Sequence, residues 1–255
     1  MRYGLIGEKL GHSWSKVIHE SFGIYTYELK ELAPAELAGF LSAREFAGIN
    51  VTIPYKKTVM PMLDEIAEDA ASVGAVNTVV NRDGKLIGHN TDRGGFLYML
   101  RAGGIDPAGK KALILGTGGA SLAVKAGLEV AEASEILFVS RKGTGPDGVV
   151  SYEQAAADHT DAMIIVNATP VGMFPHTDAS PLDLTPFKAC EAVADIIYNP
   201  AVTMLCRQAA ALGMKAVTGL DMLIAQAVEA AGYFLGHDPD PAWFGNAKAA
   251  VEKAL

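Results

Sequence analysis

The segment GINVTIPYKKT, residues 48–58, places two adjacent lysines directly after a strand-like stretch. Its first residues alternate apolar and polar side chains as a half-buried strand does, and Pro54 then ends the regular pairing. One interpretation is that the lysines solubilise the first turn of a short surface helix. The other is that the strand aims Asn50, Thr52 and one lysine into a cleft.

A second segment with the pattern of a binding site is KALILGTGGASLAVKAGLEVA, residues 111–131. A short apolar strand leads into Gly116-x-Gly118-Gly119, and a helix-forming run follows, which is the context that a dinucleotide-binding loop requires. Glycines let backbone amides at the helix start approach a pyrophosphate with no Cβ in the way. A third glycine would normally stand at Ser121, where serine is an imperfect substitute. A tight turn that binds nothing is the alternative interpretation.

The next predicted strand, EILFVS, ends at Ser140-Arg141-Lys142. A site specific for NAD usually places a carboxylate about twenty residues after the glycines, to hold the ribose 2'-hydroxyl. Here an arginine stands near that point, and its guanidinium can bind a 2'-phosphate and stack on the adenine. Taken alone this is a solvated basic turn, but after a glycine-rich loop it favours NADP over NAD.

Two more apolar strands, within residues 163–175 and 192–209, end in polar loops rich in Gly or Pro. Loops at the carboxyl ends of parallel strands are where ligands bind in open α/β sheets. Asn167 and Thr169 are therefore candidates to line the nicotinamide side, and Tyr198 is a candidate to reach a substrate. Each is equally common as an ordinary turn residue.

These segments need a scaffold, and strand-like and helix-like patterns alternate along the chain as in an α/β protein with mainly parallel sheets. Gly and Pro cluster at DPAGKK, residues 106–111, which we interpret as a domain boundary. NRDGKLIGHNTD is predicted to form a hairpin with Asp83-Gly84 as its turn. In the first part of the chain the predicted strands are residues 2–6, 25–29, 47–51 and 78–82, and the predicted helices are residues 36–45 and 63–75.

The composition limits the classes of function. The 255 residues, half of them hydrophobic, suffice for a large core, and the net charge of -8 argues against nucleic-acid and anionic-membrane partners. No apolar run has the length of a membrane span, and the first residues lack the apolar region of a secretory signal. The two cysteines, Cys190 and Cys206, suit a reduced compartment, and no metal motif appears. We expect a soluble cytoplasmic protein that acts on a small molecule, as a monomer or homodimer.

Eight segments, in order, resemble the motif series of the shikimate dehydrogenases, over nearly the whole chain. The resemblance implies an N-terminal α/β substrate domain, residues 1–104, completed by C-terminal helices at 220–255, and a Rossmann-type doubly wound NADP-binding domain, residues 105–219. The implied reaction is the reversible NADPH-dependent reduction of 3-dehydroshikimate to shikimate, in aromatic amino acid biosynthesis. The segments are GHSWS (11–15), GINVTIPYK (48–56), GAVNT (74–78), GHNTD (88–92), GTGGA (116–120), NATPVGM (167–173), DIIYNP (195–200) and GLDMLIAQA (219–227).

The resemblance gives Lys56 a catalytic role and leaves Lys57 as a surface residue. Asp92, from the NTD motif, would pair with Lys56 and hold it in place. Burial disfavours a charged ammonium whereas a neighbouring carboxylate favours it, and the sequence leaves the balance open.

The same resemblance implies a site for a small polyhydroxylated carboxylate, with Ser13 and Ser15 on the carboxylate. These serines could instead cap a helix, and Gln226 could be exposed, whereas Asn77 lies in an apolar context where a buried amide needs partners. The implied substrate-binding residues are Ser13, Ser15, Thr52, Asn77, Asp92, Tyr198 and Gln226. The implied cofactor-binding residues are Gly116, Gly118, Gly119, Ala120, Ser140, Arg141, Asn167, Thr169 and Gly219.

The chain departs from the family pattern at two places. Lys16 follows Ser15 where proline is usual, and Ser140-Arg141-Lys142 stands where Asn-Arg-Thr is common, followed by GTGPDG. Three alternatives stay open: a quinate/shikimate dehydrogenase using NAD, another Rossmann oxidoreductase such as a methylene-folate dehydrogenase, and a ligand-sensing homologue without catalysis. The second does not explain the NVTxPxK and NTD segments, and the presence of both Lys56 and Asp92 speaks against the third.

Overall fold

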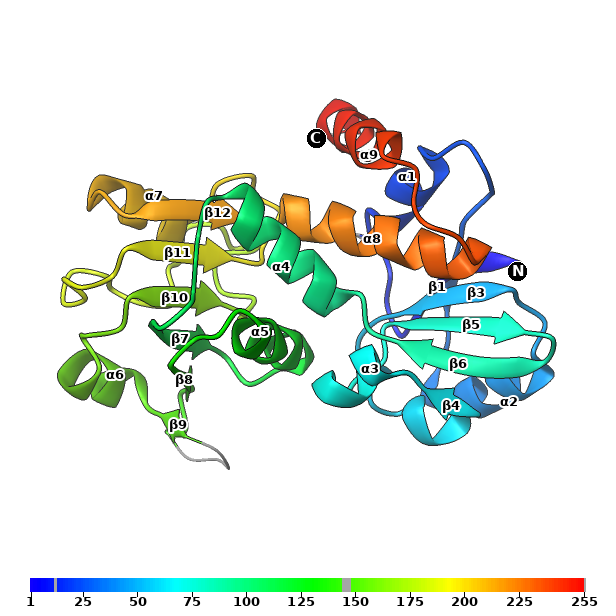
Figure 1. Cartoon of the computed structure of the whole chain (residues 1–255), viewed down its shortest axis with the longest axis horizontal. Coiled ribbons are helices and arrows are strands. Elements are labelled where there is room, and N and C mark those ends of the chain that lie inside the picture. The colour runs from blue at the N-terminus through cyan, green and yellow to red at the C-terminus, as the bar shows by residue number, and fades with distance from the viewer. Residues whose placement is uncertain (12, 144–147, 255) are drawn as a thin grey trace. The chain divides into compact units, whose positions relative to one another are not determined.

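The computed structural model describes residues 1–11, 13–143 and 148–254. They form two compact units, Met1–Gly94 with Ile224–Leu255, and Gly95–Leu223. Each unit contains a six-stranded sheet with helices packed on it, which confirms the predicted α/β class (Figure 1). None of the described helices is at once long enough and apolar enough to cross a membrane.

The sheet of the first unit has the order β2-β1-β3-β5-β6-β4. Strand β1 is parallel to β2 and β3, whereas β5 runs antiparallel to both β3 and β6. The strands are β1 (Tyr3–Gly7), β2 (Glu28–Glu31), β3 (Gly48–Val51), β4 (Glu65–Ile66), β5 (Thr78–Arg82) and β6 (Lys85–His89).

The predicted hairpin is confirmed. Asp83 and Gly84 have φ values of 51° and 87°, and they link the paired residues Arg82 and Lys85. A two-residue turn with positive φ at both positions matches the right-handed twist of the flanking strands.

Two local predictions in this unit need correction. The predicted helix at 63–75 begins only at Glu68, because residues before it form β4, which pairs with β6 through Ile87 and Gly88. Pairing with the edge of a sheet here overrides a helix-like local pattern. The predicted strand at 25–29 is observed as β2, which begins only at Glu28. The residue before it, Tyr27, is fully buried.

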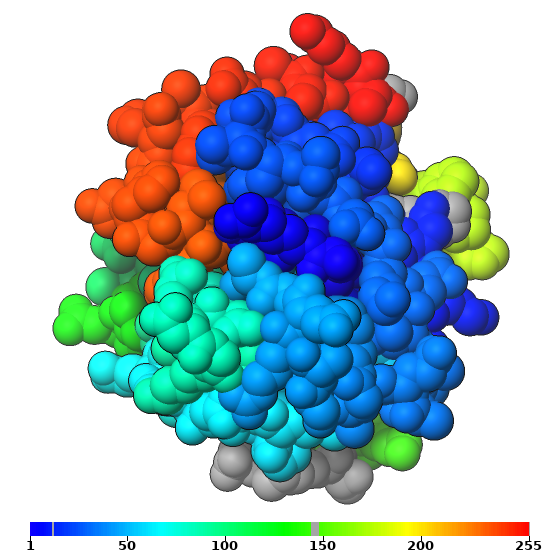
Figure 2. Space-filling model, turned by 90° about the vertical axis from the view of Figure 1, so that its right-hand side faces the viewer, coloured from blue at the N-terminus to red at the C-terminus, as the bar shows by residue number. Residues whose placement is uncertain are grey.

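The first and last helices of the first unit pack against each other. Helix α1 (Ser15–Glu20) is followed by Phe22, whose ring stacks on Trp243 of α9 (Ala242–Ala254) with centroids 5.2 Å apart. The red surface of the C-terminal segment accordingly adjoins the blue surface of the N-terminal segment in Figure 2. The other described α-helices that lie wholly in this unit are α2 (Leu37–Ala43) and α3 (Glu68–Val73), and two short 3-10 helices span Pro34–Glu36 and Met60–Met62.

The second unit has an all-parallel sheet in the order β12-β11-β10-β7-β8-β9. The chain order therefore reverses between β7 and β10, which is the topological switch point of a doubly wound sheet. The strands are β7 (Lys111–Leu115), β8 (Glu135–Val139), β9 (Val149–Val150), β10 (Ile164–Asn167), β11 (Ala192–Asp195) and β12 (Lys215–Thr218), and the helices are α5 (Gly119–Val130), α6 (Tyr152–Asp158) and α7 (Met204–Ala211).

Both faces of this sheet are buried, as an all-parallel sheet requires. Along β7, Ala112 and Ile114 belong to one core cluster, and Leu113 and Leu115 belong to the cluster on the opposite face. This alternation explains why the central strands β7, β10 and β11 are mostly apolar in sequence.

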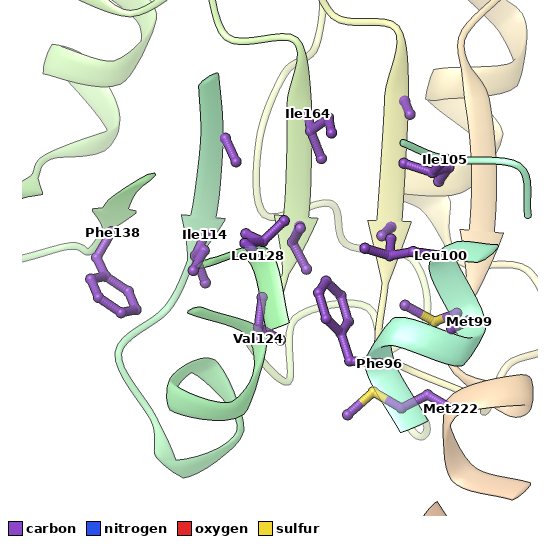
Figure 3. Packing of buried hydrophobic residues seen from close by; sticks show 14 residues of the cluster. Phe96, Met99, Leu100, Ile105, Ile114, Val124, Leu128, Phe138, Ile164 and Met222 are labelled. Atoms are coloured by element: carbon purple, nitrogen blue, oxygen red, sulfur yellow. The ribbon is translucent and has the colours of Figure 1, made fainter. Parts of the chain in front are cut away.

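Two helices run from one unit into the other, α4 (Asp92–Ala102) and α8 (Leu220–Leu235). The division between the two compact units lies inside them, and Phe96 and Met99 of α4 and Met222 of α8 belong to the core of the second unit. Figure 3 shows Phe96 among these side chains, packed with α5. A Cβ on Gly127 of α5 would lie 2.6 Å from the Phe96 ring, so glycine makes room for it.

We predict that Phe96→Ala lowers the free energy of unfolding by about 3 to 5 kcal/mol, since it leaves a cavity in this core. Chemical denaturation monitored by circular dichroism measures the change. Val130→Ala is the matched control, because Val130 is exposed at the end of α5 and should alter stability by at most about 0.5 kcal/mol. Equal effects of the two substitutions would contradict the packing described.

Candidate active site

The two adjacent lysines after β3 face in different directions. Tyr55 and Val59 are buried, and Lys57 between them is exposed. Lys56 turns inward, where its Nζ lies 2.6 Å from Oδ2 of Asp92, and its backbone carbonyl accepts a hydrogen bond from the Val76 amide. The two charged side chains are only 18% and 12% exposed. The local sequence left the choice between the lysines open, and burial of their neighbours decides it.

Asp92 is held at the start of α4 by an asparagine. Asn90 Oδ1 accepts hydrogen bonds from the backbone amides of Asp92 and Arg93, and Asn90 Nδ2 donates to the carbonyl of Ala75. An acidic residue in the first turn of a helix interacts favourably with the helix dipole. The carboxylate therefore has a fixed backbone position from which to meet Lys56.

Asn77 and Gln226 converge on one hydroxyl group. Asn77 is 3% exposed; its Oδ1 accepts from the Thr91 amide at 2.8 Å, and its Nδ2 donates to Thr91 Oγ1 at 3.0 Å. Gln226 of α8 approaches the same hydroxyl, with 3.4 Å between Thr91 Oγ1 and its Oε1. The sequence singled out both amides but not Thr91, although Thr91 lies inside the NTD motif.

Ser13 and Ser15 lie together at the start of α1. The two Oγ atoms are 3.1 Å apart, and Ser13 Oγ also accepts a hydrogen bond from the Ser15 amide at 3.3 Å. That second contact is a local turn between residues two apart and does not cap the helix, because the N-cap of α1 is Trp14 and makes no side-chain cap hydrogen bond. Both serines are half-buried, and Thr52, just after β3, is half-buried as well.

The carboxyl group of Glu229, which the sequence did not single out, is buried near Asp92. A Cβ placed on Gly94 would lie 2.0 Å from Oε2 of Glu229, so the carboxyl sits against the first turn of α4. Burial, reinforced by the charge of Asp69 and only partly offset by Arg93, raises the pKa of Glu229 to about 7, and Asp92 adds to the increase. Glu229 also lines a cavity of about 420 Å³.

Asp69 is the hydrogen-bonding centre of the same region. Its Oδ2 accepts from Tyr233 Oη at 2.8 Å and lies 3.1 Å from His89 Nδ1, and the rings of His89 and Tyr233 stack with centroids 3.9 Å apart. Burial works against ionisation, but the hydrogen bonds hold the pKa of Asp69 below its usual value. These residues come from α3, β6 and α8, and only His89 lies in one of the eight segments, GHNTD.

In the second unit, the glycine loop joins β7 to α5. Gly116 has φ 102°, and a Cβ there would lie 2.9 Å from Thr169, so glycine is required by both conformation and space. A Cβ on Gly118 or Gly119 would meet no described atom within 4 Å. Space therefore remains in front of the N-terminal amides of α5, as a pyrophosphate would need.

Ser121, which stands where a third glycine was expected, fits into the loop. Ser121 is buried, and its hydroxyl donates to the Gly118 carbonyl at 2.6 Å, so the polar group is satisfied inside the loop. Ala120 stands between them in the first turn of α5 and is half-buried.

The basic turn follows β8. Ser140 donates its backbone amide to Val150 and accepts from the Gly143 amide, while Arg141 is exposed. The charge of Arg141 partly offsets the burial that raises the pKa of Tyr152. Residues 144–147 of the GTGPDG segment lie outside the described residues.

The loop after β10 is held by buried polar contacts. Asn167 is fully buried; it donates through Nδ2 to Asp195 Oδ1 at 3.0 Å and accepts from the Thr169 hydroxyl at 2.7 Å. Burial raises the pKa of Asp195, against hydrogen bonds from Thr203, the Ile197 amide and Asn167. Asn167 thus holds the loop after β10 in place by linking Thr169 to Asp195.

Two further predicted residues lie near β11 and β12. Tyr198 is half-buried, and burial raises the pKa of its hydroxyl. A Cβ on Gly219 would lie 2.0 Å from the Ile196 carbonyl oxygen, so only glycine permits this approach of the two backbones.

A doubly wound unit with a glycine loop beside its switch strand, and a second α/β unit with a lysine–aspartate pair, define the class of dinucleotide-dependent oxidoreductases. The sequence model of the shikimate dehydrogenase substrate binding domain matches residues 5–79. A shikimate dehydrogenase (NADP(+)) from Clostridium perfringens is 36% identical over 244 residues, which cover 89% of this chain and 90% of the relative. The chain belongs to the shikimate dehydrogenase family, as the motif series predicted.

Solved structures agree with this assignment. Shikimate 5-dehydrogenase from Thermus thermophilus, in complex with NADP(H) and shikimate, has a TM-score of 0.84 and 36% identity, covering 98% of this chain and 99% of that chain. Quinate dehydrogenase from Corynebacterium glutamicum, in complex with NAD, has a TM-score of 0.88 and 30% identity, covering 99% of both chains.

We predict that the stability of the protein depends on pH through Glu229. Its pKa is raised from 4.5 to about 7 on folding, so the folded state holds the proton more tightly. The stability that this provides is complete below about pH 4.5 and is lost as the pH rises to about 7. Glu229→Gln should therefore gain stability relative to the unmodified chain over this range, by on the order of 1 to 3 kcal/mol at pH 8.

Thermal unfolding at pH 5, 6, 7 and 8 measures this gain. Glu68→Gln is the control, because Glu68 is an exposed residue of α3. A stability difference for Glu229→Gln that stayed constant across these pH values would contradict the prediction.

Proposed function

We propose that this chain is a shikimate dehydrogenase, which catalyses the reversible NADPH-dependent reduction of 3-dehydroshikimate to shikimate in aromatic amino acid biosynthesis. The observation that carries the proposal is the 2.6 Å contact between Lys56 and Asp92, two charges held in a mostly buried position next to Asn77 and Thr91. The reaction is inferred from family membership, and the ammonium group of Lys56 and the carboxylate of Asp92 are the groups proposed to carry it out.

Lys56 provides the proton for the carbonyl oxygen. NADPH, when bound, supplies the hydride to the carbonyl carbon. As the oxygen becomes negative, the ammonium of Lys56 stabilises the charge and transfers a proton to it. Asp92 keeps the ammonium in position through the ion pair. In the reverse direction the same pair accepts the proton of the hydroxyl group.

The polar groups of the first unit suit a ring with hydroxyl groups and one carboxylate. The adjacent hydroxyls of Ser13 and Ser15 bind the carboxylate, and a ring hydroxyl meets the amides of Asn77 and Gln226 around Thr91. Thr52 and Asp92 complete the set. Such a site discriminates against a substrate that leaves its polar groups unpaired.

NADP binds to the second unit in this proposal. The open space at Gly118 and Gly119, before the amides of α5, fits a pyrophosphate, and the exposed Arg141 fits a 2'-phosphate. Thr169 and Gly219 border the strand ends where the rest of the dinucleotide would lie. Asn167 contributes by fixing the loop that carries Thr169.

We accordingly assign substrate binding to the first unit and cofactor binding to the second. This keeps the functional division expected from the sequence, with limits at Gly94 and Ile224 in place of residues 104 and 220. We also propose a cytoplasmic location, for which two buried free cysteines are suited, and a monomeric or homodimeric state.

The alternative is a quinate-type enzyme that uses NAD, because the quinate dehydrogenase above covers this chain as fully as the shikimate enzyme does. The test is one pair of assays with the purified chain, NADPH with 3-dehydroshikimate and NAD with quinate. Faster turnover in the first assay supports the proposal. Faster turnover in the second would replace it, and no turnover in either would favour a ligand-sensing role.

We predict that Lys56→Ala lowers kcat by roughly 10²- to 10⁴-fold, with a much smaller change in KM, because the proton transfer belongs to the transition state. Lys57→Ala is the matched control and should be nearly silent, since Lys57 is exposed. Asp92→Asn should also be severe, and its effect should not add fully to that of Lys56→Ala. Similar steady-state kinetics for the two lysine variants would refute the assignment.

Cofactor choice gives a separate prediction. Arg141→Ala should weaken NADP binding about tenfold to a hundredfold and change NAD binding little, because a charge-assisted hydrogen bond is worth about 1.5 to 3 kcal/mol. Raising the salt concentration should reduce the preference of the unmodified chain for NADP. Titration calorimetry measures both, with the exposed Lys188→Ala as the control. Equal affinities of the unmodified chain for NADP and NAD would overturn the role of Arg141.

A further inference from the structure

A fully buried tyrosine lies one residue before β2 and bonds to an asparagine of β3. Tyr27 has no exposed surface, and its hydroxyl donates to Oδ1 of Asn50 at 2.6 Å. Asn50 is itself buried, and its Nδ2 lies 3.3 Å from the backbone carbonyl of Asn77 and 3.0 Å from Thr78 Oγ1. A chain of hydrogen bonds therefore joins Tyr27 to the residues beside Asn77.

The backbone fixes the direction of every bond in this chain. A backbone carbonyl only accepts, so the atom of Asn50 that faces the Asn77 carbonyl must be its NH₂ group. Its oxygen then faces Tyr27, whose hydroxyl has to donate. Thr78 Oγ1 accepts a hydrogen bond from Asn50, and its own hydroxyl group donates to Oδ1 of Asn77 at 3.0 Å.

The far end of the chain is fixed in the same way. The Thr91 amide only donates, and it bonds to Oδ1 of Asn77 at 2.8 Å. Nδ2 of Asn77 therefore points to Thr91 Oγ1, at 3.0 Å, where Gln226 also approaches. The orientation of the Asn77 amide is thus supported from two sides, by the Thr91 backbone and by Thr78.

The Tyr27 ring has little freedom. The imidazole of His19 lies against it with centroids 4.1 Å apart and planes 2° apart, and His19 Nδ1 is 2.8 Å from the hydroxyl of Tyr25. Burial lowers the pKa of His19 to about 3, against a smaller contribution from the neighbouring Asn50, so the ring is neutral at ordinary pH. The phenol is held as a fixed donor.

We propose that Tyr27 is a positioning residue for the substrate site: its hydroxyl sets the orientation of Asn50 and, through Thr78, the orientation of the Asn77 amide. The inference rests on the proposed function, in which Asn77 contacts a ring hydroxyl of the substrate. Tyr27 itself is fully buried and acts only through this chain.

Removal of the Tyr27 hydroxyl leaves Asn50 Oδ1 buried without its donor. The Asn50 amide cannot reverse to recover a partner, because its oxygen would then face the Asn77 carbonyl. A shift of Asn50 would weaken its hydrogen bond to Thr78 and, in turn, the hydrogen bond from Thr78 to Asn77. The Asn77 amide, which binds substrate in the proposed function, would then be held less firmly. We expect Tyr27→Phe to raise the KM and the Kd for shikimate about five- to tenfold, with less than about a twofold change in kcat.

The matched control is Tyr55→Phe. Tyr55 is also buried, and its hydroxyl donates to the Leu32 carbonyl at 2.5 Å, outside the hydrogen bonds of Asn50. Both variants lose one buried hydrogen bond and should lower the melting temperature by similar amounts. Only Tyr27→Phe should alter the KM and the Kd for shikimate, measured at saturating NADP and by titration calorimetry.

Thr78→Val tests the same chain with Tyr27 intact. It should raise the KM for shikimate by a similar factor, and in the double variant the two effects should not add. If Tyr27→Phe does not fold, an unchanged KM in Thr78→Val overturns the proposal on its own.

The activity of the unmodified chain distinguishes a failure of the Tyr27 role from a failure of the proposed function. Activity of this chain with a KM that is equal in Tyr27→Phe and Tyr55→Phe would overturn the positioning role alone. A folded but inactive unmodified chain would remove the proposed function and, with it, the role of Tyr27.

Discussion

The ion pair between Lys56 and Asp92 is the constraint on which the first unit depends. Two charges with this little exposure are tolerated only if they are close together and their backbones are fixed. Asn90 fixes the start of α4, and the Val76 amide fixes the Lys56 backbone. Loss of one partner would leave the other charge uncompensated, so the surrounding polar residues are organised around the pair.

The second unit meets a different requirement, which is to leave backbone amides available. The central strands of its sheet are buried on both faces by apolar side chains. Glycine at positions 116 and 219 allows close approaches of backbone, while Gly118 and Gly119 keep the start of α5 uncovered. An anion-binding helix terminus requires a rigidly packed sheet to hold the helix and open space in front of its first backbone amides.

Local signals were sufficient for much of the fold. The Asp83-Gly84 turn and the alternating strands are encoded by neighbouring residues, so they were predicted correctly. Strand β4 was missed because its two residues have no strand pattern of their own and exist only through pairing with β6. Thr91 and Glu229 were missed for a related reason, since their neighbours Asn77 and Gly94 come from segments distant in sequence.

The sequence by itself determined the family, the α/β class and the residue types of the candidate site, because glycine loops and strand-end polar groups recur at fixed spacings. The family resemblance already favoured Lys56 over Lys57, and the tertiary structure gives the physical reason, since Tyr55 and Val59 are buried against the core while Lys56 reaches Asp92. It also decided that Glu229 is buried beside α4 and that Tyr27 bonds to Asn50. Burial and the direction of a hydrogen bond arise from packing between segments, which no local pattern contains.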